Sequence, residues 1–448
     1  MSHYKPYPAY KDSGVEWLGK VPEHWEISQL KYLATHIGSG KTPSGGAEVY
    51  QDSGVLFLRS QNVYEDGLRL DDAVFISESV DQEMAGSRVQ EYDVLLNITG
   101  ASIGRSCLVS EGFQQANVNQ HVCIVRAADT SLAKWLSQCL PSLSVQAQID
   151  FFQNGAGREG LNFEQIGNMY VALPLVNEVG EISDALDRET TRIDALISKK
   201  TRFIELLREK RQALITHAVT KGLDPRVKMK DSRVEWLGEV PEHWDVKRLK
   251  FIATVQTGVA KGKDTTGEQT VEVPYLRVAN VQDGYLDLSE VATIEITASD
   301  LPRYLLQPGD VLMNEGGDFD KLGRGHVWNG EVESCIHQNH VFAVRPHSVA
   351  SRWLNTFTSS AAAQFYFMGR SKQSTNLASI SSSNLMELAV PLPPDAEQGA
   401  ILGKLASVLA RVDSSLQKTE RSIELLKERR SALITAAVTG QIDLREAA

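Results

Sequence analysis

Two glycine-rich segments come closest to a known catalytic pattern. Residues 38–42 read GSGKT, which looks like the end of a phosphate-binding loop, where backbone amides hold phosphates and a lysine reaches the outer ones. The position of the first glycine that this motif requires holds Thr35, and the second half of the chain has GVAKG at 258–262, without the Lys-Thr ending. We therefore expect no nucleotide site here. The loop suits a contact with DNA phosphate or a plain turn equally well.

The second segment, GGDF at 316–319, matches the four-letter signature of diguanylate cyclases, in which an acidic residue serves metal and phosphate. The match is short, Asp320 follows it, and the first half of the chain has TGAS at 99–102 in its place. Acidic side chains at this point would repel phosphate unless a metal intervened. Chance explains the match better, so we expect no cyclase activity.

Other catalytic patterns are missing from the sequence. Methyl transfer to adenine uses Asn or Asp followed by Pro-Pro and an aromatic residue, as enzymes of that class show, whereas Pro393-Pro394 is followed by Asp395. The sequence contains no H-E-x-x-H, no G-x-S-x-G and no convincing nuclease cluster of two acids and a lysine. It predicts a binding protein with no catalytic residue, no metal site and no cofactor of its own.

Composition points to a globular protein of several domains. A length of 448 residues exceeds one ordinary core, and the sequence has neither a membrane-spanning apolar run nor a signal-peptide core, so we expect a cytoplasmic protein. The cysteines lack C-x-x-C spacing, which argues against zinc and disulfides. We expect reduced, mostly buried thiols at Cys107, Cys123, Cys139 and Cys335.

The chain is one unit written twice. Residues 11–35 return as 230–254, displaced by 219 positions, and residues 204–219 return as 423–438 with the same displacement. Between these ends the two copies diverge, but landmarks persist at Arg59 and Arg277, Arg105 and Arg324, His121 and His340, and Trp135 and Trp353. Two similar domains with different loops are expected if each domain recognises a different target.

Each copy begins with short β-type runs, such as VLFLRSQNV and DVLLNIT, separated by Gly, Ser, Asn and Asp clusters, which predicts a compact mixed α/β domain. Each copy ends in a heptad pattern that predicts a helix of about 36 residues, roughly 54 Å long. A lone amphipathic helix of this length cannot bury its seam, so we expect the two helices to pack antiparallel, with the domains at opposite ends of a rod and related by a pseudo-twofold axis. The predicted seam is Ile182, Leu186, Ile193, Leu196, Phe203, Leu207 and Leu214 in the first copy, and Ile401, Leu405, Val408, Val412, Leu426 and Leu433 in the second.

This pattern resembles the specificity subunits of type I restriction-modification systems. The resemblance covers nearly the whole chain, from the VPEHW segments at 21–25 and 240–244 through both helices. Its most specific parts are PLPPDAEQGAI at 391–401 and IELLKERRSALITAAVTG at 423–440. The first copy departs from the pattern where Val179 corresponds to Gln398 and one proline is missing.

The resemblance implies two target-recognition domains, 11–173 and 230–390, and two spacer helices, 174–222 and 391–440. In that family each domain reads half of a bipartite double-stranded DNA site, and the helices set the spacing and dock two methyltransferase subunits. Restriction subunits join that core, and the specificity subunit carries no active site. S-adenosylmethionine, ATP and magnesium are therefore expected on the partner subunits.

Candidate DNA contacts are polar side chains on glycine-rich loops, because Arg and Lys favour guanine while Asn and Gln favour adenine. In the first domain we expect Lys41, Thr42, Arg59, Gln61, Asn62, Arg105, Asn119, Gln120 and Arg158. In the second we expect Lys261, Lys263, Arg277, Asn280, Arg324, His326, Gln338, Asn339, Lys372, Gln373 and Asn376.

The comparison of the two copies sorts these candidates. Arginines that both copies share fit contacts with the DNA backbone or framework roles. Base recognition is expected from residues that differ between the copies, such as Gln61 and Ala279. We expect the shared histidines His121 and His340 to be buried beside a strand.

Charge alone does not support DNA binding, since the formal net charge is −11 and phosphate is normally neutralised by Lys and Arg. The distribution of charge over the surface matters more than the net charge, and basic partner subunits can supply phosphate binding. A basic stripe on the helices is either a solvated face or a surface for phosphate or a partner: Lys199, Lys200, Arg202, Arg208, Lys210, Arg211, Lys418, Arg421, Lys427, Arg429 and Arg430. The main alternative function is a two-domain coiled-coil scaffold without DNA specificity.

Overall fold

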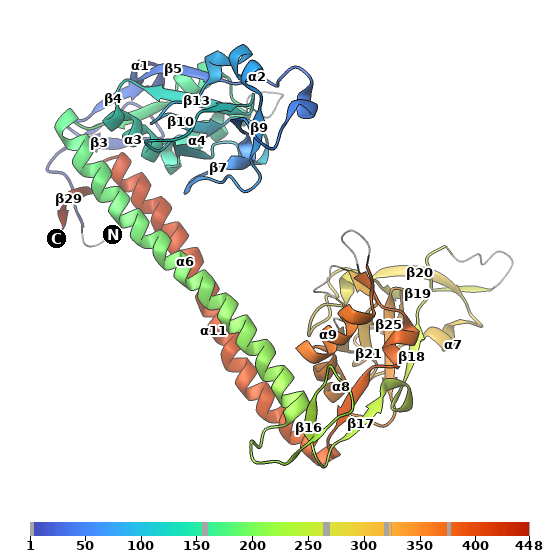
Figure 1. Ribbon diagram of the computed structural model, residues 1–448. Helices are drawn as coiled ribbons and strands as arrows, with labels where there is room; N and C mark the ends of the chain where they lie inside the picture. The colour runs from blue at the N-terminus through green and yellow to red at the C-terminus, as the bar shows by residue number, and fades with distance from the viewer. Residues whose placement is uncertain are drawn as a thin grey trace. The chain divides into compact units, whose positions relative to one another are not determined.

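The computed structural model describes residues 4–154, 160–262, 269–317, 322–323, 325–373 and 378–447 (Figure 1). The chain divides into two compact units, of which unit 1 comprises Met1–Thr201 with Arg421–Ala448 and unit 2 comprises Arg202–Glu420. Each unit holds a body of mixed strands and short helices together with one part of each long helix.

Unit 1 is built on two sheets of order β11-β10-β13-β5 and β12-β6-β9. The first is antiparallel throughout, while β12 runs parallel to β6. Every residue of β6 and β10 is buried, which is why these strands read as continuous apolar runs rather than alternating ones. The strands are β5 (Ala34–Ser39), β6 (Val55–Leu58), β9 (Val74–Ile76), β10 (Val94–Asn97), β11 (Ser106–Leu108), β12 (Ala116–Val118) and β13 (Val122–Ala127).

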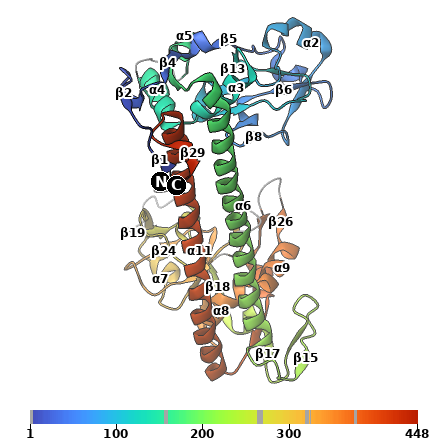
Figure 2. The ribbon, with the colours of Figure 1, turned by 90° about the vertical axis from the view of Figure 1, so that its left-hand side faces the viewer.

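Smaller elements complete unit 1. The strand pairs are β1 (Tyr4–Lys5) with β29 (Asp443–Ala447), β2 (Tyr10–Asp12) with β3 (Lys20–Pro22), β4 (Glu26–Gln29) with β14 (Tyr170–Leu173), and β7 (Val63–Tyr64) with β8 (Gly67–Leu68). The helices are α1 (Leu30–Leu33), α2 (Glu78–Glu83), α3 (Thr130–Cys139), α4 (Leu143–Asn154) and α5 (Phe163–Gly167). The β1–β29 pair joins the two ends of the chain, which lie together in Figures 1 and 2.

Unit 2 repeats this topology, with sheets of order β18-β25-β21-β23 and β20-β19-β24 and with β24 parallel to β19. These strands are β18 (Ala253–Thr257), β19 (Thr270–Leu276), β20 (Ala292–Thr297), β21 (Val311–Asn314), β23 (Gly325–Val327), β24 (Ile336–His337) and β25 (Val341–Pro346). The other strands are β15 (Met229–Asp231), β16 (Glu239–Pro241), β17 (Asp245–Arg248), β22 (Gly316–Gly317), β26 (Lys372–Gln373), β27 (Ala378–Ser379) and β28 (Ala389–Leu392). The helices are α7 (Leu301–Tyr304), α8 (Ser351–Thr358), α9 (Ala361–Arg370) and α10 (Ser382–Met386).

The two cores use the same tryptophan pair. Trp25 meets Trp135 edge-on at 5.8 Å between ring centroids, and Trp244 meets Trp353 at 5.6 Å. All four rings are fully buried. The tryptophan of each VPEHW segment is therefore a core residue, which explains why that segment persists in both copies while the loops do not.

The long helices α6 (Val176–Lys221) and α11 (Asp395–Val438) have 46 and 44 residues. The predicted length of about 36 residues is too short, because the helices begin soon after the preceding proline and continue to the glycine beyond the heptad pattern. Gly222 and Gly440 follow at φ +76° and +68°, the left-handed conformation that ends a helix and favours glycine.

Within each unit, α6 and α11 lie side by side and run in opposite directions (Figures 1 and 2). In unit 2 Arg208 binds Glu420 at 3.3 Å, and Arg211, further along α6, binds Asp413, which lies earlier in α11, at 3.0 Å. In unit 1 Arg430 binds Asp194 at 2.9 Å. The predicted antiparallel pairing is confirmed.

The predicted seam is wrong at two positions of α6. Leu196 and Phe203 are 41% and 48% exposed, whereas their neighbours Ile197 and Ile204 are part-buried and buried. Both residues of each adjacent pair are apolar, so the sequence pattern fits two alternative seams. The structure buries the one that contains Ile197 and Ile204. None of the helices among the described residues is long and apolar enough to cross a membrane.

Candidate nucleic-acid interface

Four loops of unit 1 meet at one edge of its sheets, which we call loop edge 1 (residues 40–43, 59–62, 98–105 and 119–121). The parallel strands β6 and β12 end at the same side, where the backbone N–H of Asn119 donates to Leu58 O at 3.0 Å. The loop after β10 joins them, since the N–H of Ile98 donates to the carbonyl of His121 at 3.0 Å. Asn97 donates its side-chain amide to Ser60 O at 2.8 Å.

The GSGKT segment supplies the fourth loop. A Cβ on Gly40 would lie 1.6 Å from Val118 O, so only glycine allows β5 to approach β12 this closely. The following residues form a turn and the short 3-10 helix Gly46–Val49, not the α-helix of a phosphate-binding loop. Gly40 therefore serves backbone packing, and Lys41 and Thr42 are left exposed beside it.

Unit 2 builds the same arrangement, loop edge 2 (residues 258–262, 277–280, 315–317 and 338–340, with strands β26 and β27). Gly258 takes the place of Gly40, with a Cβ position 1.9 Å from His337 O. The N–H of Gln338 donates to Leu276 O at 2.8 Å, and that of Glu315 donates to His340 O at 2.9 Å. Strand β22 pairs with β27, which brings Lys372 of strand β26 to this edge.

A chain of three polar side chains lies on each loop edge. In unit 1 the Gln120 amide donates to Nε2 of His121 at 3.0 Å, and Nδ1 of His121 lies 2.6 Å from the Thr99 hydroxyl. In unit 2 the contacts are from the Asn339 amide to Nε2 of His340, at 3.4 Å, and from Nδ1 of His340 to the Glu315 carboxylate, at 2.8 Å.

The histidines of these chains are not buried as expected. The His121 side chain is half-buried, and that of His340 is 59% exposed. The buried histidine is His337, whose counterpart is Val118. Burial lowers the pKa of His337, which keeps its ring neutral, and its Nδ1 contacts Val341 O at 2.7 Å. The shared histidines were misassigned because repetition alone does not distinguish a shared surface role from a shared core role.

Several predicted site residues serve the chain's own turns. Asn62 and Asn280 are buried, and each caps its turn by accepting from the N–H of Arg59 or Arg277 and donating to a carbonyl seven residues ahead. Asn119 is 8% exposed and accepts from the His121 N–H. These amides are already used, so we leave all three out of the proposed interface.

The two shared arginines of these turns are also held by the protein. Arg59 donates to Asp72 O at 2.7 Å, and Arg277 binds Glu290 at 3.1 Å. Both side chains are part-exposed at the loop edge, so they suit either of the two roles that their repetition favours, a contact with the DNA backbone or a framework role.

Arg105, the last residue of the 98–105 loop, and His326, in strand β23, each line a cavity of their own unit. Arg105 stacks on Tyr64 at 4.5 Å and lines a cavity of about 530 Å³ with Arg69 and Lys427. His326 lines a cavity of about 1200 Å³ formed by β23, α8 and α11 in unit 2. Exposed predicted residues that remain on the loop edges are Lys41, Thr42, Gln61, Gln120, Lys261 and Lys372, with Gln338 and Asn339 part-exposed. Arg158, Lys263, Arg324, Asn376 and the side chain of Gln373 lie outside the described residues.

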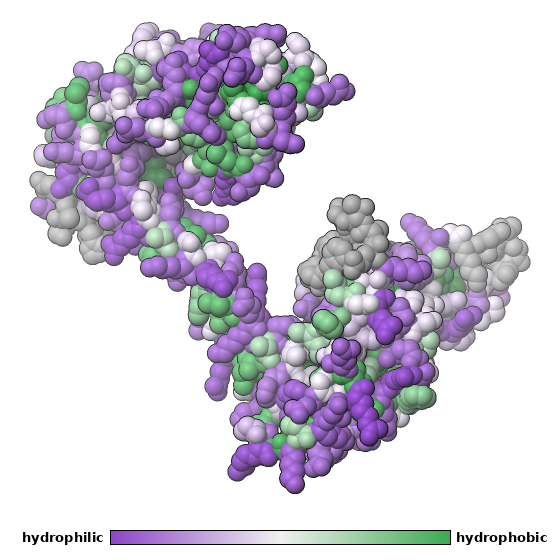
Figure 3. All heavy atoms as spheres, in the orientation of Figure 1, coloured by the Kyte–Doolittle hydropathy of each residue, from purple (hydrophilic) through white to green (hydrophobic). Residues whose placement is uncertain are grey.

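The surface of each unit is largely polar, and its cysteines are buried. Figure 3 shows hydrophilic residues over most of the visible face of each unit, and interfaces with nucleic acid are polar. Among the described residues no group of His, Cys, Asp and Glu is arranged to hold a metal ion. All four cysteines are free and buried, as predicted.

Five of the eleven cations in the basic stripe, all of them arginines, are paired with acidic side chains within their units. Arg202 binds Glu205 and Arg421 binds Glu424, in addition to the pairs between α6 and α11. These arginines stabilise the helices and leave lysines such as Lys199 and Lys427 as the more available cations.

Comparison with known proteins shows which proteins this chain resembles. Residues 241–426 match the family model described as "Type I restriction modification DNA specificity domain". The chain is 20% identical over 438 residues to the type I restriction enzyme EcoKI specificity subunit of Escherichia coli (strain K12), which covers 95% of this chain and 90% of the relative. It is 19% identical to the StySPI specificity subunit of Salmonella potsdam, over 95% and 90% of the two chains.

A solved chain from work on "complex assembly and conformational transition of the type I R-M system" has the same fold. It aligns with a TM-score of 0.69 at 16% identity, over 94% of this chain and 99% of that one. The resemblance to type I restriction-modification specificity subunits is thus confirmed. The alternative of a scaffold without DNA specificity is not favoured.

Proposed function

We propose that this chain is the DNA sequence-recognition subunit of a type I restriction-modification complex, in which each unit reads one half of a bipartite site. One observation carries the proposal: the same framework builds both loop edges, while the exposed side chains on them differ. Gln61 in unit 1 stands where unit 2 has Ala279, and in unit 2 Lys372 lies exposed on strand β26, which pairs with β27. A repeated framework with different exposed polar groups suits two different half-sites.

The contacts that we assign to DNA are the side chains left available on the loop edges. Lys41, Thr42, Gln61 and Gln120 serve one half-site, and Lys261, Gln338, Asn339 and Lys372 serve the other. Gln338 contributes its amide N–H groups, because its carbonyl accepts from the Val278 N–H at 3.4 Å. Arg158, Lys263, Arg324, Gln373 and Asn376 stay sequence-based predictions.

The rest of the assembly follows from the resemblance. We assign docking of two adenine-methyltransferase subunits and the spacing of the half-sites to the paired helices, and we place the complex with its DNA in the cytoplasm. Restriction subunits complete it. We assign S-adenosylmethionine, ATP and magnesium to these partners, and basic surfaces on them can supply the phosphate binding that a chain of net charge −11 lacks.

Exchange of one recognition domain tests the proposal. Residues 11–171 are replaced by the corresponding domain of a related protein, and the methylated sequences are determined in a host that carries the partner subunits. One half of the methylated motif should change and the other should stay. A chain that binds no DNA with its partners at low salt would support the scaffold instead, and a change in both halves would refute the assignment of one half-site to each unit.

A further inference from the structure

We propose that Gln120 and Asn339 each read an adenine within their half-sites, and that His121 and His340 are the positioning residues that fix these two amides. The proposal rests on the function proposed above and goes further by naming the base. It stands on the three-residue chains Gln120–His121–Thr99 and Asn339–His340–Glu315.

The hydrogen-bond capacity of the amide selects the base. A Gln or Asn amide has two N–H donors and one carbonyl acceptor. The histidine Nε2 takes one N–H, so one N–H and the carbonyl remain. These match the N7 acceptor and the N6 amino donor that adenine presents in the major groove. Guanine presents two acceptors there, so the remaining carbonyl would face an acceptor.

The ring is held from its other side. An amide N–H can only donate, so Nε2 accepts from it, and Nδ1 is then the ring nitrogen that donates to the Thr99 hydroxyl or the Glu315 carboxylate. Each ring thus has both nitrogens engaged and acts through the amide that it orients. The contacts at Nδ1, 2.6 Å and 2.8 Å, are shorter than the amide contacts at Nε2, 3.0 Å and 3.4 Å.

The position of the chains on the loop edges supports a role in binding. Gln120 is exposed and Asn339 is part-exposed, whereas the preceding Asn119 is buried and already paired. Both units place an amide and a histidine at this point, while residues nearby differ, such as Gln61 against Ala279. A shared amide reads the same kind of base in both halves, and the differing residues distinguish the halves.

A change of hydrogen-bonding type tests the reading residues. The full chain, assembled with its methyltransferase partner, selects duplexes from a random-sequence library, and the bound sequences are determined. Q120E replaces the donor with a second acceptor, so the preferred base should change from adenine to cytosine at one position of one half-site, by a factor on the order of tenfold. N339D should do the same in the other half. The matched control is Q114E. Gln114 is exposed and precedes the start of β12, whereas Gln120 follows the end of that strand, so Q114E should leave the base preferences unchanged.

The positioning role has its own readout. T99V removes the hydroxyl that holds His121 and should lower the adenine preference in that half, while T99S restores it. E315L should act likewise in the other half, and E315Q, which keeps an acceptor, should retain the preference. Unchanged base preferences in both Q120E and N339D, with DNA binding intact, would overturn the inference. Failure of the unmodified assembly to select any sequence would reject the proposed function instead.

Discussion

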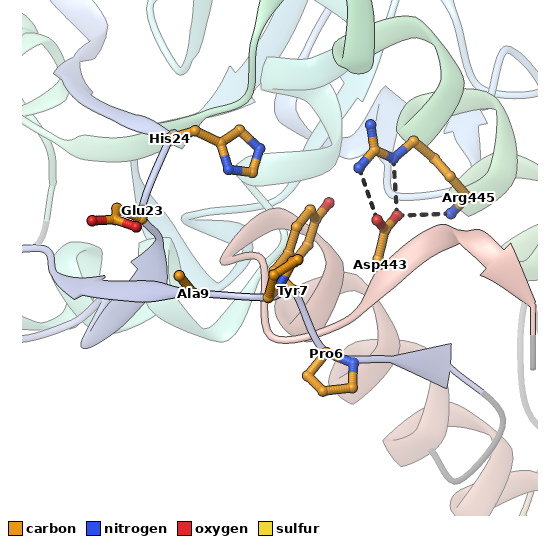
Figure 4. A pocket seen from close by; sticks show the side chains of 8 residues that line it. Pro6, Tyr7, Ala9, Glu23, His24, Asp443 and Arg445 are labelled. Carbon is orange, nitrogen blue, oxygen red and sulfur yellow. Dashed lines mark hydrogen bonds and ion pairs between the residues drawn. The ribbon is translucent and has the colours of Figure 1, made fainter.

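Nη1 of Arg445 lies 2.5 Å from Oε1 of Glu178, which ties the last strand of the chain, β29, to the first turn of α6 in unit 1. The same guanidinium binds Asp443 at 2.8 Å, and His24 contacts the other Glu178 oxygen at 3.0 Å. Figure 4 shows Arg445, Asp443 and His24 around one pocket of about 630 Å³. The histidine of the first VPEHW segment thus lines a pocket together with residues near both ends of the chain, such as Tyr7 and Arg445.

Loss of this arginine should destabilise unit 1. The Glu178 side chain is 9% exposed, and R445A would leave its charge with His24 alone. We expect the free energy of unfolding to fall by about 1–2 kcal/mol, less than for a fully buried pair because Arg445 is 26% exposed. Denaturant unfolding of the variant measures the change.

The repeat supplies the control for this variant. Arg226 occupies the equivalent position in unit 2, but its side chain is 89% exposed and it binds Asp224, while Glu397 is held by His243 and Trp244. R226A should therefore change stability by under about 0.5 kcal/mol. Equal losses in the two variants would show that the contact with Glu178 is not what stabilises the C-terminal strand.

The cysteines should be unreactive in the native protein. Burial raises the pKa of Cys107, Cys123 and Cys335 to about 12, and burial also raises that of Cys139. Since the thiolate is the reactive form, almost none is present at pH 8. A colorimetric thiol reagent should detect no cysteine in the native chain and all four in guanidinium. Rapid reaction of one thiol without denaturant would contradict the burial.

Repetition within the sequence was enough to predict the two mixed α/β bodies and the pair of long helices. The choice between adjacent apolar positions was not predictable, because Leu196 and Ile197, like Phe203 and Ile204, satisfy a heptad equally well. Only the partner helix decides which of them is covered. The exposure of Leu196 and Phe203 beside the buried seam is therefore known from the structure and not from the sequence.

The site was predictable in part for a similar reason. The composition of the glycine-rich loops indicates polar residues that can bind DNA. No local sequence pattern predicts that these loops meet, because the strand order brings them together. Asn62 was chosen as a polar loop residue although its side chain caps a turn. Thr99 and Glu315 were missed because their importance comes only from contact with a histidine more than twenty residues away.

Arg233 offers a stabilising substitution. It adopts φ +60°, a left-handed conformation unfavourable for a residue with a side chain, and its counterpart in unit 1 is Gly14 at φ +70°. Both turns are held by the same contact, from the backbone N–H to the Asp231 or Asp12 carboxylate. R233G should raise the free energy of unfolding by about 0.5–1 kcal/mol, the relieved strain outweighing the added chain entropy. The mirror variant G14R should lower it, and a stability loss in R233G would show that the arginine side chain makes a favourable contact.

The last prediction concerns the helices and depends on the proposal that they set the spacing of the half-sites. Inserting four residues near Leu196, an exposed position of α6, adds about 6 Å at ~1.5 Å per residue. On DNA that rises about 3.4 Å per base pair, this corresponds to one or two pairs. The insertion also displaces the heptad seam against α11, so repacking can absorb part of the gain and lower activity. Both half-sequences should stay as they were while the unread gap between them grows, which sequencing of methylated sites measures. The same four residues inserted after Asp224, beyond the end of α6, should leave the gap unchanged. An active variant with a normal gap after insertion at Leu196 would show that α6 and α11 do not determine the spacing.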